Sequence, residues 1–287
     1  MPGVTDRVVI VTGAGGGLGR EYALLLAREG ALVVVNDLGG ARDGSGSGHN
    51  MADTVVEEIR AAGGTAVANY DSVATTEGAQ ALVQTALDSF GAVHGVVNNA
   101  GILRDMSFAK MTPEAFEAVQ RVHLFGAFNV THAAWGHFRE QGFGRVVMAT
   151  STSGLYGNFG QANYGAAKLG MVGMMNTLVY EGRKYDIKVN AVAPIAATRM
   201  TEDLMSAEML AKLGPAQVAP IVGYLVSEEN QDSGTVLVVG GGSVQRLQLF
   251  ANKPVLFSEV PTLDQVRENW SRITDMSDAQ PGVNPAG

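Results

Sequence analysis

Short β-branched runs and helix-like segments alternate about seven times along this chain, and that alternation limits its possible folds more than any other feature. The predicted strands are Arg7–Thr12, Ala31–Val35, Ala66–Tyr70, Val93–Val97, Arg145–Thr150, Lys188–Ala193 and Thr235–Val239. Regular alternation favours right-handed βαβ units, whose strands form one parallel sheet. The sequence therefore predicts a single α/β domain, a doubly wound parallel sheet of about seven strands with helices on both faces.

Apolar residues at helical spacing fill most segments between these strands. The predicted helices are Leu18–Glu29, Met51–Ala62, Glu77–Phe90, much of Pro113–Glu140 and Ala162–Tyr185, with two short ones in Met200–Val226. Thr112 is expected to cap the helix that begins at Pro113, and Gly39–Asn50 to form a long loop. The pattern is lost after about Gln245. We therefore predict a domain over residues 1–245 and a C-terminal extension over 246–287, disordered after about Met276.

The composition excludes several classes of function. Of the 287 residues, 46% are hydrophobic and 17% charged, so the chain can bury a full core. A net charge of -8 argues against a broad nucleic-acid-binding face. The absence of cysteine excludes disulfides, thiolate metal sites and a cysteine nucleophile, and we expect no metal site. No signal peptide or membrane-spanning run is evident, so we expect a cytoplasmic protein.

The first predicted strand runs into a glycine-rich turn, Thr12-Gly13-Ala14-Gly15-Gly16-Gly17-Leu18-Gly19. Backbone amides in such a turn approach a pyrophosphate, and side chains would block them, so glycine is needed at Gly13, Gly17 and Gly16. Gly19 lets the following helix pack close to the strand, and the helix N-terminus favours phosphate. This context predicts a Rossmann-type dinucleotide site. The alternative is a tight turn with no ligand.

Asp37, at the end of the second predicted strand, bears on the choice of dinucleotide. A carboxylate there accepts hydrogen bonds from the adenosine ribose hydroxyls and repels a 2′-phosphate. No Arg or Lys occupies Ala14–Leu18, and the nearest basic residue after the strand is Arg42, in the long loop. The sequence therefore predicts NAD rather than NADP. The alternative is that Asp37 is a surface acid in a turn.

Tyr164 and Lys168 stand four positions apart at the start of the longest predicted helix, so both lie on one face. A tyrosine with a pKa of about 10 is a poor base at neutral pH, and a nearby ammonium favours its phenolate. The pair can then move a proton to or from a substrate oxygen, and Lys168 can also bind the nicotinamide ribose. Ser151 ends the preceding strand, where its hydroxyl can hydrogen-bond that oxygen. These three are the predicted catalytic residues, although Ser151 also fits a loop-capping role.

Four ordered motifs together resemble the short-chain dehydrogenase/reductase family: TGAGGGLG at Thr12–Gly19, NNAG at Asn98–Gly101, Ser151, and YGAAK at Tyr164–Lys168. The resemblance runs from about Arg7 to Gly242. It implies that Asn98 shapes the cofactor cleft, that Asp71 contacts the adenine amine beside Ser72, and that Thr198 holds the nicotinamide carboxamide. The cofactor-binding residues expected in all are Gly13, Gly16, Gly17, Leu18, Gly19, Asp37, Asp71, Ser72, Asn98, Ala100, Gly101, Tyr164, Lys168, Pro194 and Thr198.

Longer stretches are similar to one branch of that family, the (3R)-hydroxyacyl-CoA dehydrogenase units of peroxisomal multifunctional enzymes type 2, also described as a 17β-hydroxysteroid dehydrogenase type, and their bacterial stand-alone relatives. They include Val33–Gly40, Ala52–Val73, Asn98–Asp105, Tyr156–Gly170 and Glu181–Pro194. The resemblance implies an NAD-dependent oxidoreductase that converts (3R)-hydroxyacyl-CoA, including steroid-derived acyl groups, to 3-ketoacyl-CoA. Two alternatives stay open: a 17β-hydroxysteroid dehydrogenase acting on free steroids, and a non-catalytic NAD-binding sensor.

The chain departs from the wider family pattern at two positions. His123 stands where many members have an Asn that relays protons to the Lys, and a packed helix histidine is the alternative role. Ile195 stands where a Gly usually follows Pro194. The segment Ile195–Leu213 is expected to cover the substrate. Apolar residues on more than one face of the helix Ala162–Tyr185 predict a homodimer or homotetramer.

Overall fold

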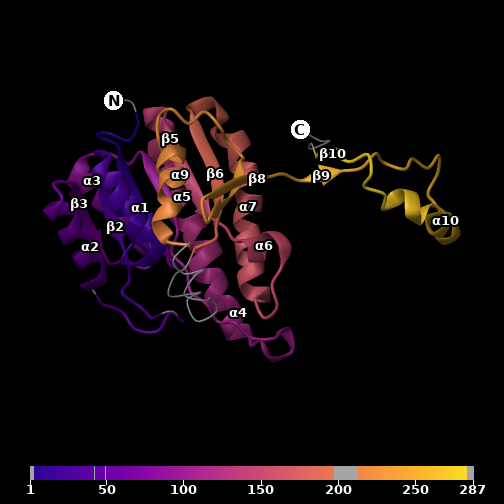
Figure 1. Ribbon diagram of the computed structural model, residues 1–287, viewed down its shortest axis with the longest axis horizontal. Helices are drawn as coiled ribbons and strands as arrows, with labels where there is room; N and C mark the ends of the chain where they lie inside the picture. Colours follow the sequence, from indigo (N-terminus) through magenta and orange to yellow (C-terminus); the bar gives the residue numbers. More distant parts are fainter. Residues whose placement is uncertain (1–2, 42, 49, 197–212, 283–287) are drawn as a thin grey trace. The chain divides into compact units, whose positions relative to one another are not determined.

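Each of the seven predicted β-branched runs forms a strand in the computed structural model, which describes residues 3–41, 43–48, 50–196 and 213–282 (Figure 1). The strands are β1 (Val8–Thr12), β2 (Leu32–Asn36), β3 (Thr65–Asn69), β4 (Gly95–Asn98), β5 (Gly144–Ala149), β6 (Ile187–Pro194) and β7 (Val236–Gly240). They pair in parallel in the order β3-β2-β1-β4-β5-β6-β7. The strand order reverses between β1 and β4, and ligands bind at such a switch point in open α/β sheets.

The sheet has eight strands rather than about seven, because β8 (Ser243–Leu247) lies beside β7. Gly241 and Gly242, with φ of 59° and 76°, join these two strands. A two-residue connection of this kind joins antiparallel neighbours. β8 reads SVQRL and is largely exposed, so it lacks the buried apolar run by which the other strands are recognisable in the sequence.

Helices cover both faces of the sheet, as predicted (Figure 1). They are α1 (Gly17–Arg28), α2 (Asn50–Ala61), α3 (Thr76–Phe90), α4 (Pro113–Gln120), α5 (Gly126–Gln141), α6 (Thr152–Tyr156), α7 (Ala162–Gly182) and α9 (Ala219–Leu225). Alternate strand residues such as Val9, Val33 and Val147 share one buried cluster with α1, α2 and α9. Helices α3, α5 and α7 also pack on the strands. A sheet covered on both faces explains the continuous Val-rich strands.

The helical stretch predicted over Pro113–Glu140 is confirmed, with an interruption. Thr112 caps α4 by accepting a hydrogen bond from the Ala115 N–H, and Pro113 occupies the first turn. A π-helix, Arg121–Phe125, separates α4 from α5. Helix α6 was not predicted. Of the two helices expected in Met200–Val226, α9 is present, and residues 197–212 lie outside the described residues.

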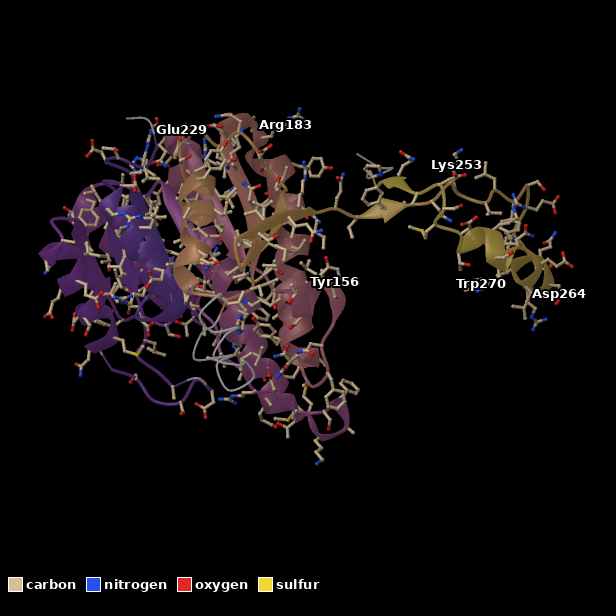
Figure 2. The ribbon with its side chains drawn as sticks, in the orientation of Figure 1. Tyr156, Arg183, Glu229, Lys253, Asp264 and Trp270 are labelled. Atoms are coloured by element: carbon tan, nitrogen blue, oxygen red, sulfur yellow. The ribbon has the colours of Figure 1, made fainter. Side chains whose placement is uncertain are left out.

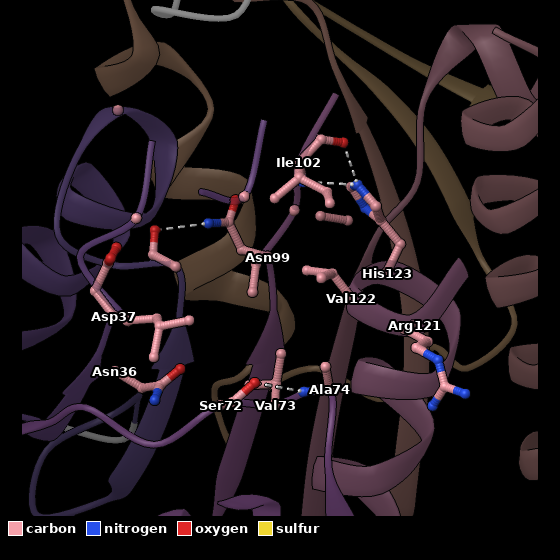
Figure 3. Close-up of a pocket in the computed structure, with 18 of the residues that line it drawn as sticks. Asn36, Asp37, Ser72, Val73, Ala74, Asn99, Ile102, Arg121, Val122 and His123 are labelled. Carbon is pink, nitrogen blue, oxygen red and sulfur yellow. Dashed lines mark hydrogen bonds between the residues drawn. The ribbon is translucent and has the colours of Figure 1, made fainter. Parts of the chain in front are cut away.

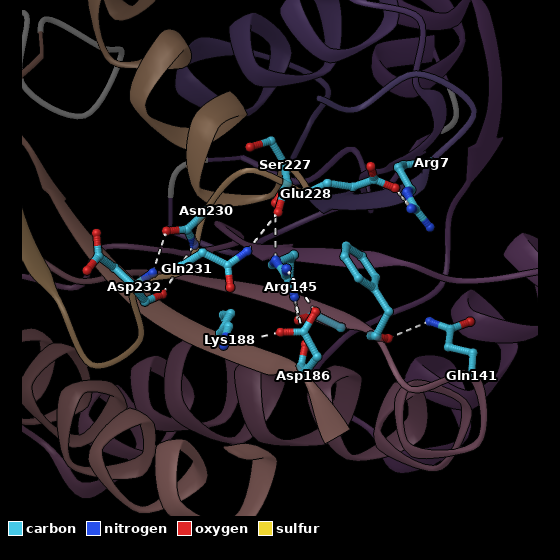
Figure 4. A network of polar contacts seen from close by, with 12 residues as sticks. Arg7, Gln141, Arg145, Asp186, Lys188, Ser227, Glu228, Asn230, Gln231 and Asp232 are labelled. Atoms are coloured by element: carbon cyan, nitrogen blue, oxygen red, sulfur yellow. Dashed lines mark hydrogen bonds and ion pairs between the residues drawn. The ribbon is translucent and has the colours of Figure 1, made fainter. Parts of the chain in front are cut away.

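A buried polar network lies at the amino ends of β5 and β6 (Figure 4). Arg145 is fully buried, and its guanidinium donates to the carbonyls of Ser227 and Asp186 at 3.1 and 2.6 Å. It also forms an ion pair of 3.2 Å with the Asp186 carboxylate and lies 4.1 Å from the centre of the Phe143 ring. These contacts satisfy a charge that would otherwise be costly to bury.

The chain divides into two compact units, Met1–Gln245 and Arg246–Gly287. The second contains β9 (Phe250–Ala251), α10 (Leu263–Ile273) and β10 (Gln280–Pro281), in which β9 and β10 pair antiparallel. Trp270 and Asp264 lie on α10 (Figure 2). None of the described residues of this second unit is buried. Disorder was expected after about Met276, yet β10 is formed, while residues 283–287 lie outside the described part.

No helix of the described residues is long and apolar enough to cross a membrane.

Candidate active site

A cavity of about 470 Å³ opens where the parallel strands end (Figure 3). Residues that follow β1, β2, β3, β4 and β5 all line it, so the chain concentrates its polar strand ends at one edge of the sheet. The predicted site residues that line the cavity are Gly13, Gly16, Gly17, Leu18, Asp37, Asp71, Ser72, Ala100, Gly101, Tyr164, Lys168 and Pro194. Residues from six separate segments of the sequence therefore meet at the switch point of the sheet.

The glycine turn has the geometry that a close approach to a ligand needs. Gly13 and Gly17 have φ of 63° and 54°, in the left-handed region that favours glycine. A Cβ on Gly19 would overlap the Gly13 carbonyl, so this glycine does allow close packing of helix and turn. Gly16 is extended, with φ of −174°, so its backbone does not require glycine. Gly15 was not predicted to require glycine. There is no room for a side chain at this position, because an added Cβ would lie 2.8 Å from the Asp37 carboxylate.

The NNAG motif contributes its second asparagine to the cavity, not its first. The Asn98 side chain is buried away from the cavity and donates to the Thr131 hydroxyl at 2.9 Å. Asn99 lines the cavity, and its amide donates to the carbonyls of Thr12 and Gly13 at 3.0 and 3.1 Å. The assignment of Asn98 to the cleft is therefore corrected: Asn98 supports β4 from behind, while Asn99 fixes the glycine turn.

Asp37 directly follows β2 and faces the glycine turn, as its place in the sequence predicts. One carboxylate oxygen accepts the Gly15 N–H at 2.8 Å, and the other accepts the Gly39 N–H at 2.7 Å. Each carboxylate oxygen can accept more than one hydrogen bond. The two backbone amides thus fix the carboxylate, which can still accept further hydrogen bonds.

Asp71 and Ser72 line the cavity beyond the end of β3. The Asp71 carboxylate accepts a hydrogen bond of 2.7 Å from the Asn69 amide, and the Asp71 carbonyl accepts one of 2.9 Å from Asn36. Asn36 and Asn69 are buried at the ends of neighbouring strands and bonded to each other at 2.8 Å. This asparagine pair, which no sequence argument singled out, fixes the segment that carries Asp71.

Ser151 and Tyr164 meet at the end of β5. Ser151 caps α6 by accepting the Ser153 N–H at 3.1 Å, so the capping role is real. Its side chain is also hydrogen-bonded to the Tyr164 phenol. Burial raises the pKa of Tyr164, the hydrogen bond with Ser151 opposes that rise, and the charge of Asp105 adds to it. Ser151 therefore caps α6, and the same side chain contacts the Tyr164 phenol.

Lys168 lies one turn along α7 from Tyr164 and is only 3% exposed. Its ammonium donates to the Ala149 carbonyl at 2.5 Å and lies 5.4 Å from the centre of the Tyr164 ring. Burial lowers the pKa of Lys168 to about 7. The expectation that Lys168 lowers the pKa of Tyr164 is not met in this structure, because burial of the phenol is the larger influence and raises that pKa.

The loop after Asp37 reaches the segment that follows β4. Gly40, Ala41 and Gly44 line the cavity, as does Arg104 on the opposite side. The Arg104 side chain donates to the Asp43 carbonyl at 3.0 Å. The long loop predicted over Gly39–Asn50 is thus attached to the far wall of the cavity.

Two predicted features fall at the edge of what the structure describes. Thr198 lies outside the described residues, as does most of the expected substrate cover, Ile195–Leu213. Ile195, the departure from the usual glycine, donates its N–H to the Val239 carbonyl at 2.7 Å and is 39% exposed. The backbone after Pro194 therefore follows the end of β7 before the described segment ends at Ala196.

Comparisons with known proteins agree with this geometry. The family model of short chain dehydrogenases matches residues 7–209. A short-chain type dehydrogenase/reductase of Mycobacterium tuberculosis is 65% identical over 98% of both chains. The peroxisomal multifunctional enzyme type 2 of Mus musculus is 51% identical over 95% of this chain, which spans only 37% of that relative.

Two solved structures extend the comparison to three dimensions. A short chain dehydrogenase from Mycobacterium avium has a TM-score of 0.85 and 40% identity, with 98% of both chains covered. A 7α-hydroxysteroid dehydrogenase complexed with NADH and 7-oxo glycochenodeoxycholic acid has a TM-score of 0.75 and 28% identity, over 84% of this chain and 96% of that one. The Rossmann-type fold, the site at its switch point and the family match agree, and the chain belongs to the short-chain dehydrogenase family of oxidoreductases.

Proposed function

We propose that this oxidoreductase uses NAD to oxidise the hydroxyl of a (3R)-hydroxyacyl-CoA to the 3-keto group. The observation that carries the proposal is that Tyr164 and Lys168 line one cavity with the glycine turn, while Ser151 contacts the Tyr164 phenol. A proton-transfer group and a dinucleotide cradle within one cavity are what alcohol oxidation needs. Residues 1–245 would form the catalytic domain.

The residues present fit a dinucleotide. Helix α1 has no side-chain N-cap and no acidic residue in its first turn, so the helix's own residues leave its positive end free for an anion. A Cβ on Gly13 would lie 2.8 Å from the Ala100 backbone, so the turn packs against the NNAG segment only because Gly13 lacks a side chain. The proposed cofactor contacts are the glycine turn for the pyrophosphate, Asp37 for the adenosine ribose, and Asp71 with Ser72 for the adenine.

The catalytic roles follow from the positions of the three side chains. A dinucleotide held by the glycine turn would supply the hydride acceptor for the carbinol carbon. Tyr164 takes the hydroxyl proton, and the Ser151 hydroxyl holds the substrate oxygen. Lys168 is buried beside the phenol, and its ammonium, when charged, would offset part of the cost that burial imposes on the phenolate.

We propose NAD rather than NADP because of Asp37. Its carboxylate is fixed by two backbone amides at the end of β2, and the turn facing it holds no basic residue. A 2′-phosphate would bring a second negative charge against this carboxylate. The NADH in the related hydroxysteroid dehydrogenase structure supports the same choice.

The substrate class rests on the relatives. Those named as multifunctional or hydratase-dehydrogenase-epimerase enzymes are 45–52% identical, and this chain spans 31–60% of their length. A free hydroxysteroid is the second candidate, favoured by the bile-acid derivative in a related structure. The test is NADH formation with (3R)- and (3S)-hydroxyacyl-CoA of several chain lengths and with 17β-hydroxysteroids. Turnover of steroids alone, or of the (3S) isomers, would overturn the acyl-CoA assignment; binding without turnover of any alcohol would favour a sensor.

We also propose a homodimer or homotetramer. Besides the face that packs on the sheet, α7 carries Leu169 and Tyr180, which are 50% and 63% exposed. Phe128 on α5 is 48% exposed. Exposed apolar side chains mark a protein–protein interface where they form one contiguous patch, and we propose that these three belong to such a patch. A monomeric mass in solution at micromolar concentration would contradict this proposal.

A further inference from the structure

His123 occupies an unusual stretch of backbone at the wall of the active site. It is the central residue of the π-helix Arg121–Phe125, lines the cavity and is 2% exposed. Single π-helical turns within α-helices are rare and occur frequently at functional sites. The extra residue in the turn alters which side chains face inward, so the placement of His123 depends on this interruption.

The imidazole ring contacts the backbone of the NNAG segment. Its Nε2 lies 3.0 Å from the Ile102 nitrogen and 2.8 Å from the Ile102 carbonyl oxygen (Figure 3). A Cβ on Gly101 would overlap the ring. Because Gly101 does not have a positive φ, the ring of His123 is what requires glycine at this position.

The other side of the ring contacts Tyr164. The two rings are edge to face, with centres 5.1 Å apart and planes at 88°. This is a favourable geometry for aromatic pairs. Ile102, Val119 and Ala167 form a small buried cluster against which Tyr164 also packs. The phenol is therefore held on one side by Ser151 and on another by His123.

The ring is not a charged group in this setting. Burial lowers the pKa of His123 well below its ordinary value, and the nearby Lys168 charge lowers it further. Its Nδ1 is buried and has no hydrogen-bond partner among the described residues. A neutral, rigidly placed ring suits a role in geometry and in exclusion of water.

We propose that His123 is a positioning residue, whose ring holds the Tyr164 phenol in place and ties it to the Gly101–Ile102 backbone of the cofactor cleft. This inference rests on the proposed role of Tyr164 as proton acceptor. It assigns to His123 a role that acts through Tyr164 and does not require His123 itself to exchange a proton.

The first consequence concerns Gly101. Gly101→Ala should displace the His123 ring, lower the melting temperature and reduce kcat on the order of 10- to 100-fold. In the His123→Ala background the added methyl group has room. Gly101→Ala should therefore lower the melting temperature much less there than it does in the wild type. The melting temperatures of the four proteins need no substrate, so they test the contact even if the acyl-CoA assignment fails. Strictly additive losses would overturn the contact as the reason for Gly101.

The second consequence concerns the phenol. The titratable and charged groups around Tyr164 are Lys168 on its own helix, Asp105 beyond β4 and His123 on the π-helix. Burial raises the Tyr164 pKa, so His123→Ala, which admits water, should lower that pKa. The rising limb of kcat against pH for alcohol oxidation should move to lower pH. His123→Phe keeps a ring against the phenol and should leave the limb nearer its original place.

The matched control is His94, a half-buried histidine whose Nδ1 accepts the Val8 N–H at 3.0 Å at the opposite edge of the sheet. His94→Ala should lower stability without moving the pH profile. Tyr164 ionisation can also be read without substrate, from the tyrosinate absorbance of each variant minus that of its Tyr164→Phe counterpart. If His123→Ala and His123→Phe both keep the wild-type phenol pKa and lose only stability, as His94→Ala does, the positioning role is wrong.

Discussion

The two edges of the parallel sheet treat buried polar groups in opposite ways. At the amino edge, Arg145 is fully buried, yet its guanidinium contacts three carbonyls, one carboxylate and one aromatic ring. At the carboxyl edge, Lys168 is almost as buried, but its ammonium donates only one hydrogen bond among those found in the described residues. The two side chains lie at opposite ends of β5: Arg145 belongs to its amino end, and Lys168 donates to the Ala149 carbonyl at its carboxyl end.

The contrast has a physical meaning. Arg145 joins β5 to the residue before β6 and to the segment after α9, so its bonds hold elements together (Figure 4). At the carboxyl edge the polar groups are left with spare hydrogen-bonding capacity: the His123 Nδ1 has no partner among the described residues, and burial lowers the pKa of Lys168 to about 7. Perturbed groups in a cavity are typical of functional sites. We therefore expect substitutions at one edge to change stability and at the other to change chemistry.

The largest effect is expected at the carboxyl edge. Tyr164→Phe removes the proton acceptor but keeps the packing, so kcat should fall by ~100-fold or more. NADH affinity, measured by fluorescence titration, should stay close to that of the wild type, because the glycine turn and Asp37 are intact. A variant that keeps more than about a tenth of the wild-type rate would mean that another group takes the proton.

At the amino edge, Arg145→Leu should cost about 3 kcal/mol of unfolding free energy, because it leaves buried carbonyls without their donor and removes one of the two ion pairs of the Asp186 carboxylate. Denaturant titration measures this loss. The folded variant should keep the KM and the pH profile of the wild type. A shift in the pH profile without loss of stability would erase the distinction between the two edges.

Lys168 gives the carboxyl edge a pH signature. Its pKa is about 7 in the folded protein and about 10.4 when unfolded, so between these values the unfolded chain holds more protons. Stability should therefore rise with pH across this window, by about 2–3 kcal/mol between pH 7 and pH 9. Unfolding of wild type and Lys168→Met at several pH values checks this. If the unfolding free energies of both proteins rise with the same slope against pH, Lys168 is charged in the folded enzyme at neutral pH.

The smallest effect concerns cofactor choice. The wild type should favour NAD over NADP by about 1.5–3 kcal/mol, roughly ten- to hundredfold, since a 2′-phosphate removes a hydroxyl donor from Asp37. Asp37→Ser should narrow the ratio of kcat/KM values for the two cofactors. Its stability should change less than that of Arg145→Leu. Equal use of both cofactors by the wild type would show that Asp37 does not face the ribose.

The sequence by itself determined the strands and the chemistry of their ends. The Val-rich runs are long enough and apolar enough to be buried on both faces, and glycines, Asp37 and Tyr164 follow them at recognisable spacings. Parallel strands bring their carboxyl ends to one edge, so these residues had to meet. Spacing also placed Lys168 one turn from Tyr164.

Only the tertiary structure decided what these side chains experience. Asn98 and Asn99 are adjacent in the sequence, and the alternation of a strand turned one toward Thr131 and left the other at the cavity. Burial, to which segments far away in the chain contribute, is the largest influence on the pKa of Tyr164. The ring of His123 makes Gly101 necessary through a contact across 22 positions. Local spacing fixes which groups meet, whereas desolvation and steric fit depend on every neighbour at once.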